Sequence, residues 1–365
     1  MAARLFPRIF PVPKLLSMGS GGIEISGHTI KYLRFDDRSE RPRVLSFGEH
    51  PLPSEAVISG EIRNKGALTE ALRAVRKSCG FSFAHVALPE QKGYLFDLVL
   101  PKDDTPLSDR IAIALPEYVP LSPAEVVYDC ETVRSESDEF TRSLVVTAFP
   151  EVAAQSYVEA LAEGGFSPLS FELEPQAAGR ALAQHAKASG AHLLIDFGVH
   201  KSVLSIMQNG VVRFATSAEG TLALDEGLRK RAAAAGIPQE KIEGELERIK
   251  FEEGLAPEGV SAPLFSTTAG ALASSIGKVM VYWQSRTQKG ERREKLSSII
   301  LYGGNANMLG LSEYLARTVG LPAAAADLRP ALGGEGVVPP IPRFESLRYA
   351  TVIGLAERAL ERAIW

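Results

Sequence analysis

The chain has 365 residues, of which 45% are hydrophobic and 23% charged, a composition typical of a globular protein long enough for two domains. Its net charge of −4 and pI near 6.0 argue against a nucleic-acid binder, which would normally carry a basic face. The two cysteines, Cys79 and Cys130, suit a reducing compartment and exclude a disulfide scaffold or a four-cysteine zinc site. No apolar run approaches the roughly 18 residues that a membrane span needs.

Residues 1–17 carry Arg4, Arg8 and Lys14 but no acid. Three prolines interrupt any apolar region, and no small-residue cleavage site follows, so a signal peptide is disfavoured. We expect a flexible N-terminal extension, with a membrane-surface or partner-binding arm as the alternative.

From residue 18 to 90 the pattern predicts three consecutive strands, a helix and a further strand. The helix is indicated by Leu68, Leu72 and Val75, which fall on one helical face. Residues 91–165 follow as a compact mixture of strands and helices, which predicts a small inserted α/β subdomain. Pro116 is expected to bend or end the first helix of this subdomain.

The second half of the chain repeats the opening pattern. A helix over 177–188 precedes a strand that ends near Asp196, and Asn209-Gly210 signals a β-hairpin after it. Charged helices are expected over 223–261, then a long helix over 268–289 with one apolar face. The strand SSIILY then leads into a Gly-rich turn, and the last helix begins near Ser346.

Two strand–turn–strand units stand out because they are similar and lie about half a chain apart. The first, GIEISGHTIKYLRF, contains Glu24, and the second, LLIDFGVHKSVLSIM, contains Asp196. A glycine in such a turn lets backbone N–H groups approach a phosphate, and an acid before the turn can hold the water shell of Mg²⁺. The pair therefore predicts two turns that face each other around a triphosphate.

A third glycine turn, Gly303-Gly304-Asn305, lies between a strand and a helix N-terminus, where a nucleotide can bind. In this order the three turns resemble the phosphate and adenosine motifs of the actin-like ATPase fold. Four further stretches resemble the PilM family of type IV pilus assembly. They are ALPEQKGYLFDLVLP, LPEYVPLSPAEVVYDCETV, LVVTAFPEVAAQSYVEALAEGGFSPLSFELEPQAAGRAL and ATVIGLAERAL.

The resemblance runs from about Gly22 to Leu360 and implies an α/β protein with two similar halves, a nucleotide cleft between them and an inserted small α/β subdomain. We expect the first half over 18–90 with 166–190 and 346–365, the insertion over 91–165, and the second half over 191–345 with a helical subdomain at 223–261. Gly354 is expected to allow the two halves to approach closely.

The resemblance also assigns residues to an ATP and Mg²⁺ site. Glu24 and Asp196 would hold Mg²⁺ through water, and Glu174 would orient water near the terminal phosphate. The cofactor-binding residues would be Glu24, Ser26, Gly27, Lys31, Asp196, Gly198, Lys201, Gly303, Gly304 and Asn305.

Two departures from the family pattern concern this site. Glu24 is one methylene longer than the usual aspartate, and Lys201 stands in a turn where the family has hydroxyls. A metal site shared by His28 and His200 is disfavoured, because turn histidines are common and their spacing does not gather ligands. Hydrolysis, if present, is expected to be slow.

The resemblance implies a cytoplasmic ATP-binding scaffold, peripheral at the inner face of the cytoplasmic membrane, in a type IV pilus or type II secretion-like system. Its partner would be the cytoplasmic tail of an inner-membrane PilN-like protein, docked beside the insertion; other pilus components and self-association stay open. The alternatives are an actin-fold phosphotransferase or ATPase, for which no sugar pocket is found, and an FtsA-like filament protein. The latter would end in a linker and an amphipathic helix, whereas IGLAERALERAI runs directly to Trp365.

Overall fold

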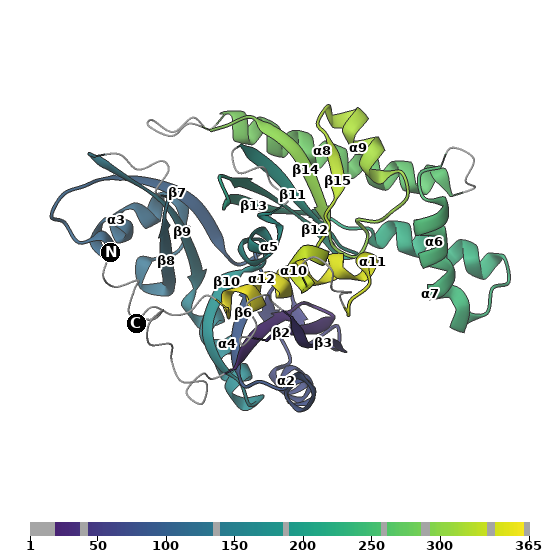
Figure 1. The fold of residues 1–365 in the computed structure, drawn as a ribbon, viewed down its shortest axis with the longest axis horizontal. Coiled ribbons are helices and arrows are strands. Elements are labelled where there is room, and N and C mark those ends of the chain that lie inside the picture. Colours follow the sequence, from purple (N-terminus) through teal and green to yellow (C-terminus); the bar gives the residue numbers. More distant parts are fainter. Residues whose placement is uncertain are drawn as a thin grey trace.

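The structure is a computed structural model in which three larger β-sheets and one two-stranded sheet are flanked by helices (Figure 1). The predicted N-terminal extension lies outside the residues that it describes. These are 19–36, 43–133, 139–184, 190–256, 261–285, 293–333 and 340–360.

The first sheet has the strand order β10-β6-β1-β2-β3. Strands β1, β2 and β3 form the predicted antiparallel meander, and β6 and β10 join it in parallel. Helix α2 covers one side and buries the predicted face of Leu68, Leu72 and Val75. We call this sheet and its helices the first half. Its elements are β1 (Ser20–Ile25), β2 (Thr29–Phe35), β3 (Val44–Pro51), β4 (Val57–Ile58), β5 (Glu61–Ile62), α2 (Lys65–Cys79), β6 (Phe83–Leu88), α4 (Glu151–Glu163) and β10 (Ser167–Leu173).

The second sheet repeats this topology with the order β13-β12-β11-β14-β15. Its meander is closed by the predicted hairpin, in which Asn209 and Gly210 both have positive φ, 53° and 80°. We call this sheet and its helices the second half. Its elements are β11 (Ala191–Phe197), β12 (Lys201–Gln208), β13 (Val211–Glu219), α6 (Leu222–Ala234), α7 (Gln239–Arg248), the π-helical turn η5 (Ile249–Glu253), α8 (Ala262–Ser285), β14 (Leu296–Tyr302), α9 (Leu311–Val319), β15 (Ala323–Ala325) and α10 (Arg329–Gly333).

Two helices, α5 and α12, lie between the sheets in Figure 1 and pack against each other. Helix α5 contacts strands of both sheets, and α12 contacts β1, β2 and β6. The two halves therefore meet through this helix pair. The elements concerned are α5 (Glu174–Leu182), α11 (Arg343–Ser346), η6 (Leu347–Tyr349) and α12 (Ala350–Arg358).

A third sheet, with the order β7-β9-β8, lies at one end of the molecule (Figure 1). One face packs against α3 around a separate apolar cluster that includes Phe96, Leu115 and Val146. We call this sheet with α3 the three-stranded unit; it falls within the predicted insertion, whose limits stay a prediction. Its elements are β7 (Tyr94–Pro101), α3 (Leu107–Tyr118), η3 (Pro123–Glu125), β8 (Val126–Thr132) and β9 (Thr141–Pro150).

The other face of β7 is tied to the second half by charge. The buried carboxylate of Asp97 lies 2.6 Å from Arg213 Nε on β13 and 3.1 Å from Arg293 Nη1. The guanidinium of Arg293 also stacks over the Trp283 ring at 4.3 Å. Breaking a buried ion pair is costly, so these contacts fix the unit against the second half.

Several predicted helix limits were wrong. Helix α5 begins at Glu174 rather than 177, because Pro175 is compatible with the first helical turn and does not delay the start. Helix α8 begins at Ala262 rather than 268, and Pro116 lies inside α3, which continues to Tyr118.

Helix α8 also bears on the membrane expectation. Its 24 residues are apolar enough, by length and composition, to cross a membrane. One face, which includes Phe265, Ile276 and Trp283, is buried in the core of the second half. A core helix of a water-exposed domain passes the same test, so this is weak evidence for a span.

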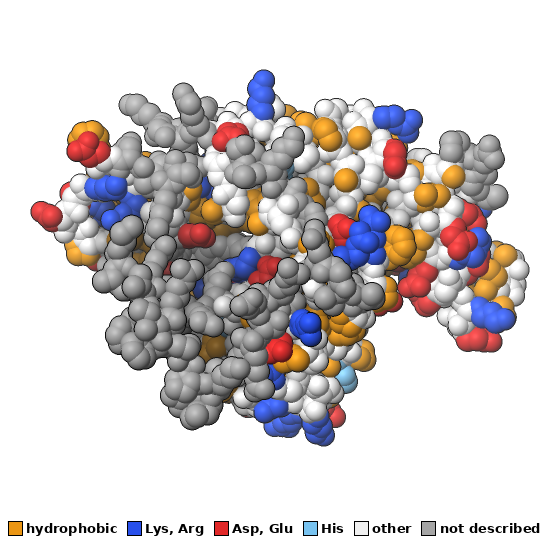
Figure 2. Space-filling model, in the orientation of Figure 1, with side chains coloured by type: hydrophobic (Ala, Val, Ile, Leu, Met, Phe, Trp, Pro, Cys, Tyr) orange, Lys and Arg blue, Asp and Glu red, His pale blue; other side chains and the backbone are white. Residues whose placement is uncertain are grey.

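Charged side chains of both signs are interspersed on the face in Figure 2. At the end that carries α6 and α7, Arg229 binds Glu243 at 2.8 Å and Arg248 binds Glu245 at 2.7 Å. These surface pairs contribute little to stability, and they mix the two signs of charge at this end of the molecule.

Candidate functional site

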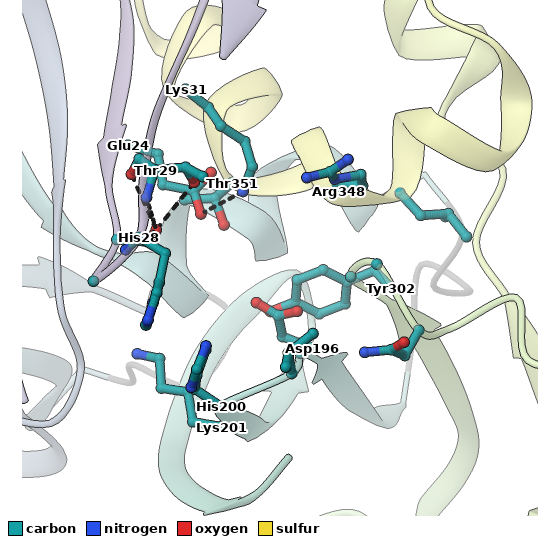
Figure 3. A pocket seen from close by; sticks show the side chains of 18 of the residues that line it. Glu24, His28, Thr29, Lys31, Asp196, His200, Lys201, Tyr302, Arg348 and Thr351 are labelled. Atoms are coloured by element: carbon teal, nitrogen blue, oxygen red, sulfur yellow. Dashed lines mark hydrogen bonds and ion pairs between the residues drawn. The ribbon is translucent and has the colours of Figure 1, made fainter. Parts of the chain in front are cut away.

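A cavity of about 1050 Å³ separates the two halves (Figure 3). All the residues that the sequence nominated for a nucleotide site line it, from both halves of the chain. They are Glu24, Ser26, Gly27, Lys31, Glu174, Asp196, Gly198, Lys201, Gly303, Gly304 and Asn305. Their roles stay a prediction, but the fold brings them together.

The first turn joins β1 to β2. Glu24 lies opposite Lys31 in the strand register, and the Lys31 ammonium is 3.4 Å from Glu24 Oε1. Glu24 Oε2 is buried and has no hydrogen-bond partner among the described residues. The Ser26 hydroxyl donates to Thr29 O and accepts from Thr29 N, both at 3.0 Å. This hydroxyl, which was predicted to face a phosphate, therefore forms hydrogen bonds within the turn.

The second turn joins β11 to β12 and has Asp196 at its start. Burial, and then the charge of Glu24 across the cavity, raise the pKa of Asp196 to about 7. Gly303 packs against this carboxylate with φ 88°, and a Cβ there would lie 2.1 Å from Asp196 Oδ1. Only glycine therefore fits beside Asp196. Figure 3 shows Glu24 and Asp196 on opposite sides of the cavity.

Asn305, predicted to hold the adenosine end, hydrogen-bonds to two neighbouring side chains. Its side chain is buried, accepts a hydrogen bond from Lys250 Nζ at 3.0 Å and donates to Thr221 Oγ1 at 3.1 Å. Lys250 also binds Asp225 at 2.7 Å. The amide thus anchors the wall of the cavity. Phe251 and Phe344 also line the cavity; they are 38% and 67% exposed and offer aromatic surface.

Lys201 on β12 reaches two acids outside the second half: Glu90, which follows β6, and Glu174, the first residue of α5. Its Nζ lies 2.6 Å from Glu90 Oε2 and 2.8 Å from Glu174 Oε2. Ser217 on β13 donates a third contact of 2.5 Å to Glu90 Oε1. We call Glu90, Lys201 and Glu174 the glutamate–lysine triad.

Burial dominates the electrostatics of the triad. It raises the pKa of Glu174 well above the usual range, with the charge of Glu90 adding to the effect and Lys201 opposing it. Burial also raises the pKa of Glu90, but Lys201 and the hydrogen bonds outweigh it and leave the pKa low. Burial lowers the pKa of Lys201, yet the two glutamates raise it above its usual value.

His28 and His200 meet across the cavity with parallel rings 3.8 Å apart (Figure 3). Burial and the neighbouring His200 lower the pKa of His28. Sequence reasoning disfavoured a shared site for them, and the structure nevertheless brings them together. Stacked rings present faces rather than ring nitrogens to each other, and among the described residues no group of three metal-binding side chains is found.

Sequence reasoning did not nominate Glu90, Ser217, Asp225 or Lys250 as site residues. Glu90 carried a signal, because the Pro89-Glu90 pair was part of the family resemblance. Asp225 and Lys250 carried none, since both fall in charged helical stretches that predict a solvated surface.

Two halves of equal topology, with acid-bearing turns facing each other across one cavity, define the actin-like ATPase fold. Solved structures agree. MreB5 of Spiroplasma citri bound to AMPPNP matches with a TM-score of 0.54 at 12% identity, covering 96% of this chain and 98% of that one. Ethanolamine utilization protein EutJ from Carboxydothermus hydrogenoformans matches with 0.50 at 15%, covering 95% and 90%.

Within this class, the match to a PilM–PilN type IV pilus biogenesis complex is stronger. Its TM-score is 0.76 at 18% identity, and it covers 94% of this chain and 99% of that chain. The family model of type IV pilus assembly protein PilM matches residues 22–360. The chain belongs to this family, and its role lies in type IV pilus assembly.

Proposed function

We propose that the chain binds an adenine nucleotide between its halves and serves as a nucleotide-holding scaffold of pilus assembly. The observation that carries the proposal is the pair of equivalent turns facing each other across a cavity of about 1050 Å³. A second actin-fold structure of MreB5 is bound to ADP, so proteins of this fold hold di- and triphosphates.

The residues that line the cavity would contact different parts of the nucleotide. Gly27 and Gly198 allow backbone N–H groups to approach phosphates, and a Cβ on Gly198 would lie 2.5 Å from Lys201 O. Phe251 and Phe344 would stack on or flank the base. Asn305 would set the shape of this end rather than bind through its amide, which is already engaged.

The carboxylates fit Mg²⁺. Glu24 Oε2 is buried without a partner among the described residues, and burial and the charge of Glu24 raise the pKa of Asp196 more than Lys31 and Lys201 lower it. A cation held through water between these two groups would satisfy both, since Mg²⁺ keeps several waters and needs few protein ligands. When bound, the ion would neutralise phosphate charge.

Nucleotide binding is tested by calorimetry and by thermal shift with Mg-ATP and Mg-ADP, because a ligand bound only by the native state raises its stability. We expect saturable binding to the wild type and to Ile113→Ser, which changes an exposed residue of the three-stranded unit. No binding at millimolar nucleotide would refute the site assignment while leaving the fold intact.

The nucleotide is proposed to be structural. Glu174, the residue assigned to orient water, is bound by Lys201 at 2.8 Å and has a raised pKa. A carboxyl group so engaged is poorly placed to activate water. This disfavours the phosphotransferase and fast ATPase alternatives.

We further propose that the chain docks the cytoplasmic tail of an inner-membrane PilN-like protein. Support comes from family membership and from the PilM–PilN complex among the similar structures.

The three-stranded unit has an edge strand at which the tail could dock. One edge strand, β7, is covered by β13, whereas β8 pairs only with β9 within the described residues. An extended tail could add to β8 as a further strand. Such a partner would place the chain at the cytoplasmic face of the inner membrane.

Docking is tested with a fluorescent peptide of the PilN-like tail from the same organism and full-length chain. Val127 lies on β8 and is 43% exposed, while Ile113 lies on α3 and is 77% exposed. We expect Val127→Glu to weaken binding at least tenfold and the matched Ile113→Glu to leave it unchanged. Equal affinity in both variants would move the tail away from β8.

A further inference from the structure

Basic side chains gather at the end of the first sheet that lies opposite the cavity. Strand β1 begins at this end with Ser20 and reaches the cavity at Ile25. Strands β6 and β10 begin at the same end, because Phe83 pairs in register with both Ser20 and Ser167. Helices α2 and α4 end there, since each leads within a few residues into one of these strands. We call this end the basic pole. Its cations are Arg34, Arg73, Arg76 and Lys77.

The four cations of the basic pole form no ion pair with a described residue. Each of the three guanidinium groups instead donates one hydrogen bond to a backbone carbonyl near the ends of α2 and α4, at 2.6 Å from Arg34 and 3.2 Å from Arg73 and Arg76. These bonds cap helix C-termini, but a guanidinium has five N–H donors, so most donors stay available. Lys77 is exposed. In Figure 2 Lys and Arg side chains gather at the lower edge of the molecule, where Figure 1 places α2.

The charge of the basic pole is not cancelled by the acids around it. Acids at this end include Asp36, Glu163 and Glu357, and each of them has a partner other than these four cations. Glu163, for example, lies 2.7 Å from Lys65, at the start of α2. The basic pole is thus a positive surface on a chain whose net charge is −4.

The N-terminal segment 1–17 joins the described chain at the basic pole, because Gly19 directly precedes β1 and lies against the Arg34 guanidinium. This segment has three cations and no acid, together with apolar residues such as Phe6 and Phe10. An anionic bilayer accommodates both kinds of side chain, since cations stay among the head groups and apolar groups enter the acyl boundary. A nucleic acid offers the charge but no apolar phase.

We propose that the basic pole, together with residues 1–17, binds the surface of an anionic phospholipid bilayer. Each lysine or arginine close to such a surface strengthens binding by about fivefold, so several dispersed cations suffice where one would not. The interaction would be a second attachment beside the proposed docking of a PilN-like tail. It depends neither on that tail nor on the nucleotide site, which lies at the other end of the sheet.

The test is flotation of the purified full chain, without a partner, on vesicles of phosphatidylcholine alone or mixed with phosphatidylglycerol. We expect binding to the mixed vesicles only, and release at high salt because salt screens exposed charges. Lys77→Glu reverses a charge without removing a contact to a described residue, and it should weaken binding by about tenfold or more. Arg4→Gln/Arg8→Gln in the full chain should weaken binding by a similar factor.

Lys278→Glu is the matched control. It makes the same change of net charge at an exposed helical lysine, on α8 of the second half, away from α2 (Figure 1). It should keep the wild-type affinity, and thermal unfolding checks that both variants fold.

Equal affinity of Lys77→Glu and Lys278→Glu would overturn the role of the basic pole, and unchanged affinity of the Arg4/Arg8 variant would overturn that of the N-terminal segment. Equal binding to both kinds of vesicle, or to neither, overturns the inference as a whole. A duplex DNA or RNA fragment bound as tightly as the anionic vesicles would overturn the choice of lipid. Each of these results leaves the nucleotide and tail proposals standing.

Discussion

Single acidic residues determine the electrostatics of the cleft. Glu24 already has Lys31 as a counter-charge at 3.4 Å, whereas burial and Glu24 raise the pKa of Asp196 to about 7. Two acids in matching turns are thus unequal partners for a cation. The difference follows from their strand neighbours, since Lys31 lies opposite Glu24 and Val203 lies opposite Asp196.

We therefore expect Asp196→Ala to weaken Mg-nucleotide binding more than Glu24→Ala, by about tenfold against a few-fold. The loss of Asp196 removes the carboxylate most in need of a cation, while the loss of Glu24 also leaves Lys31 available to phosphate. Calorimetry in excess Mg²⁺ measures both. A larger loss of affinity in Glu24→Ala than in Asp196→Ala would contradict this prediction.

His85 provides a pH prediction away from the cleft. Burial, then the charges of Arg358 and Arg180, lower its pKa to about 4, and its Nδ1 lies 2.8 Å from Ser170 Oγ. In the unfolded chain the imidazole has its ordinary pKa of 6.5, so between pH 6.5 and 4 the unfolded chain holds more protons than the native state. The contribution of His85 is thus complete above pH 6.5 and is lost as the pH falls.

The free energy of unfolding of the wild type should therefore drop more steeply than that of His85→Gln from pH 6.5 to 4, by about 1–2 kcal/mol, since solvent screens part of the effect at this partly exposed site. Urea unfolding at pH 8, 6.5 and 4 measures it, with pH 8 as the reference because the imidazole is neutral in both states there. Parallel pH curves for the two proteins would contradict the assignment.

At the scale of elements, the crossing of α5 and α12 joins the two halves. A Cβ on Gly354 would lie 1.8 Å from Ala177 O, so the helices touch backbone to backbone. Arg180 fixes the crossing by donating to Gly354 O at 3.0 Å and to both carboxylate oxygens of Glu172. Any side chain at 354 must push the helices apart.

Gly354→Ala should destabilise the protein by about 2–4 kcal/mol, as overpacking against backbone cannot relax through a rotamer change. Gly277 on α8 is the matched control, because a Cβ there meets nothing within 4 Å. Gly277→Ala should be neutral or stabilising by up to about 1 kcal/mol. Urea unfolding measures the free energy of unfolding of both variants. Equal changes in the two variants would contradict the prediction, because they would show that α5 and α12 can move apart without cost.

At the scale of the whole molecule, groups from different parts of the chain converge on Lys201. The triad joins the second half to Glu90, which precedes the three-stranded unit, and Asp97 ties that unit to β13. Because Glu174 is engaged by this arrangement, hydrolysis should stay well below the usual enzymatic range of roughly 1–10³ per second. Phosphate release under saturating Mg-ATP measures it, and a turnover inside that range would restore the enzyme alternative.

Much of the fold of this protein could be predicted from the sequence alone. Apolar periodicity and turn residues such as Asn209-Gly210 act locally, so the strand order within each meander and the pairing of the two acid-bearing turns could be predicted. The family segments extended this to the fold and to the residues that line the cleft. Helix starts were less accurate, because residues such as Pro175 are compatible with either a loop or a first helical turn.

Only the tertiary structure decided how charges are paired. Lys201 and Glu90 are separated by more than a hundred residues, and their contact depends on how two halves close, which no local pattern encodes. The same holds for Lys250 and Asn305, which are buried and hydrogen-bonded to each other beside the cavity, and for the stacked His28 and His200. Side-chain identity fixes what a group can do, but burial and neighbours fix its charge and its availability, and both arise only when distant segments pack together.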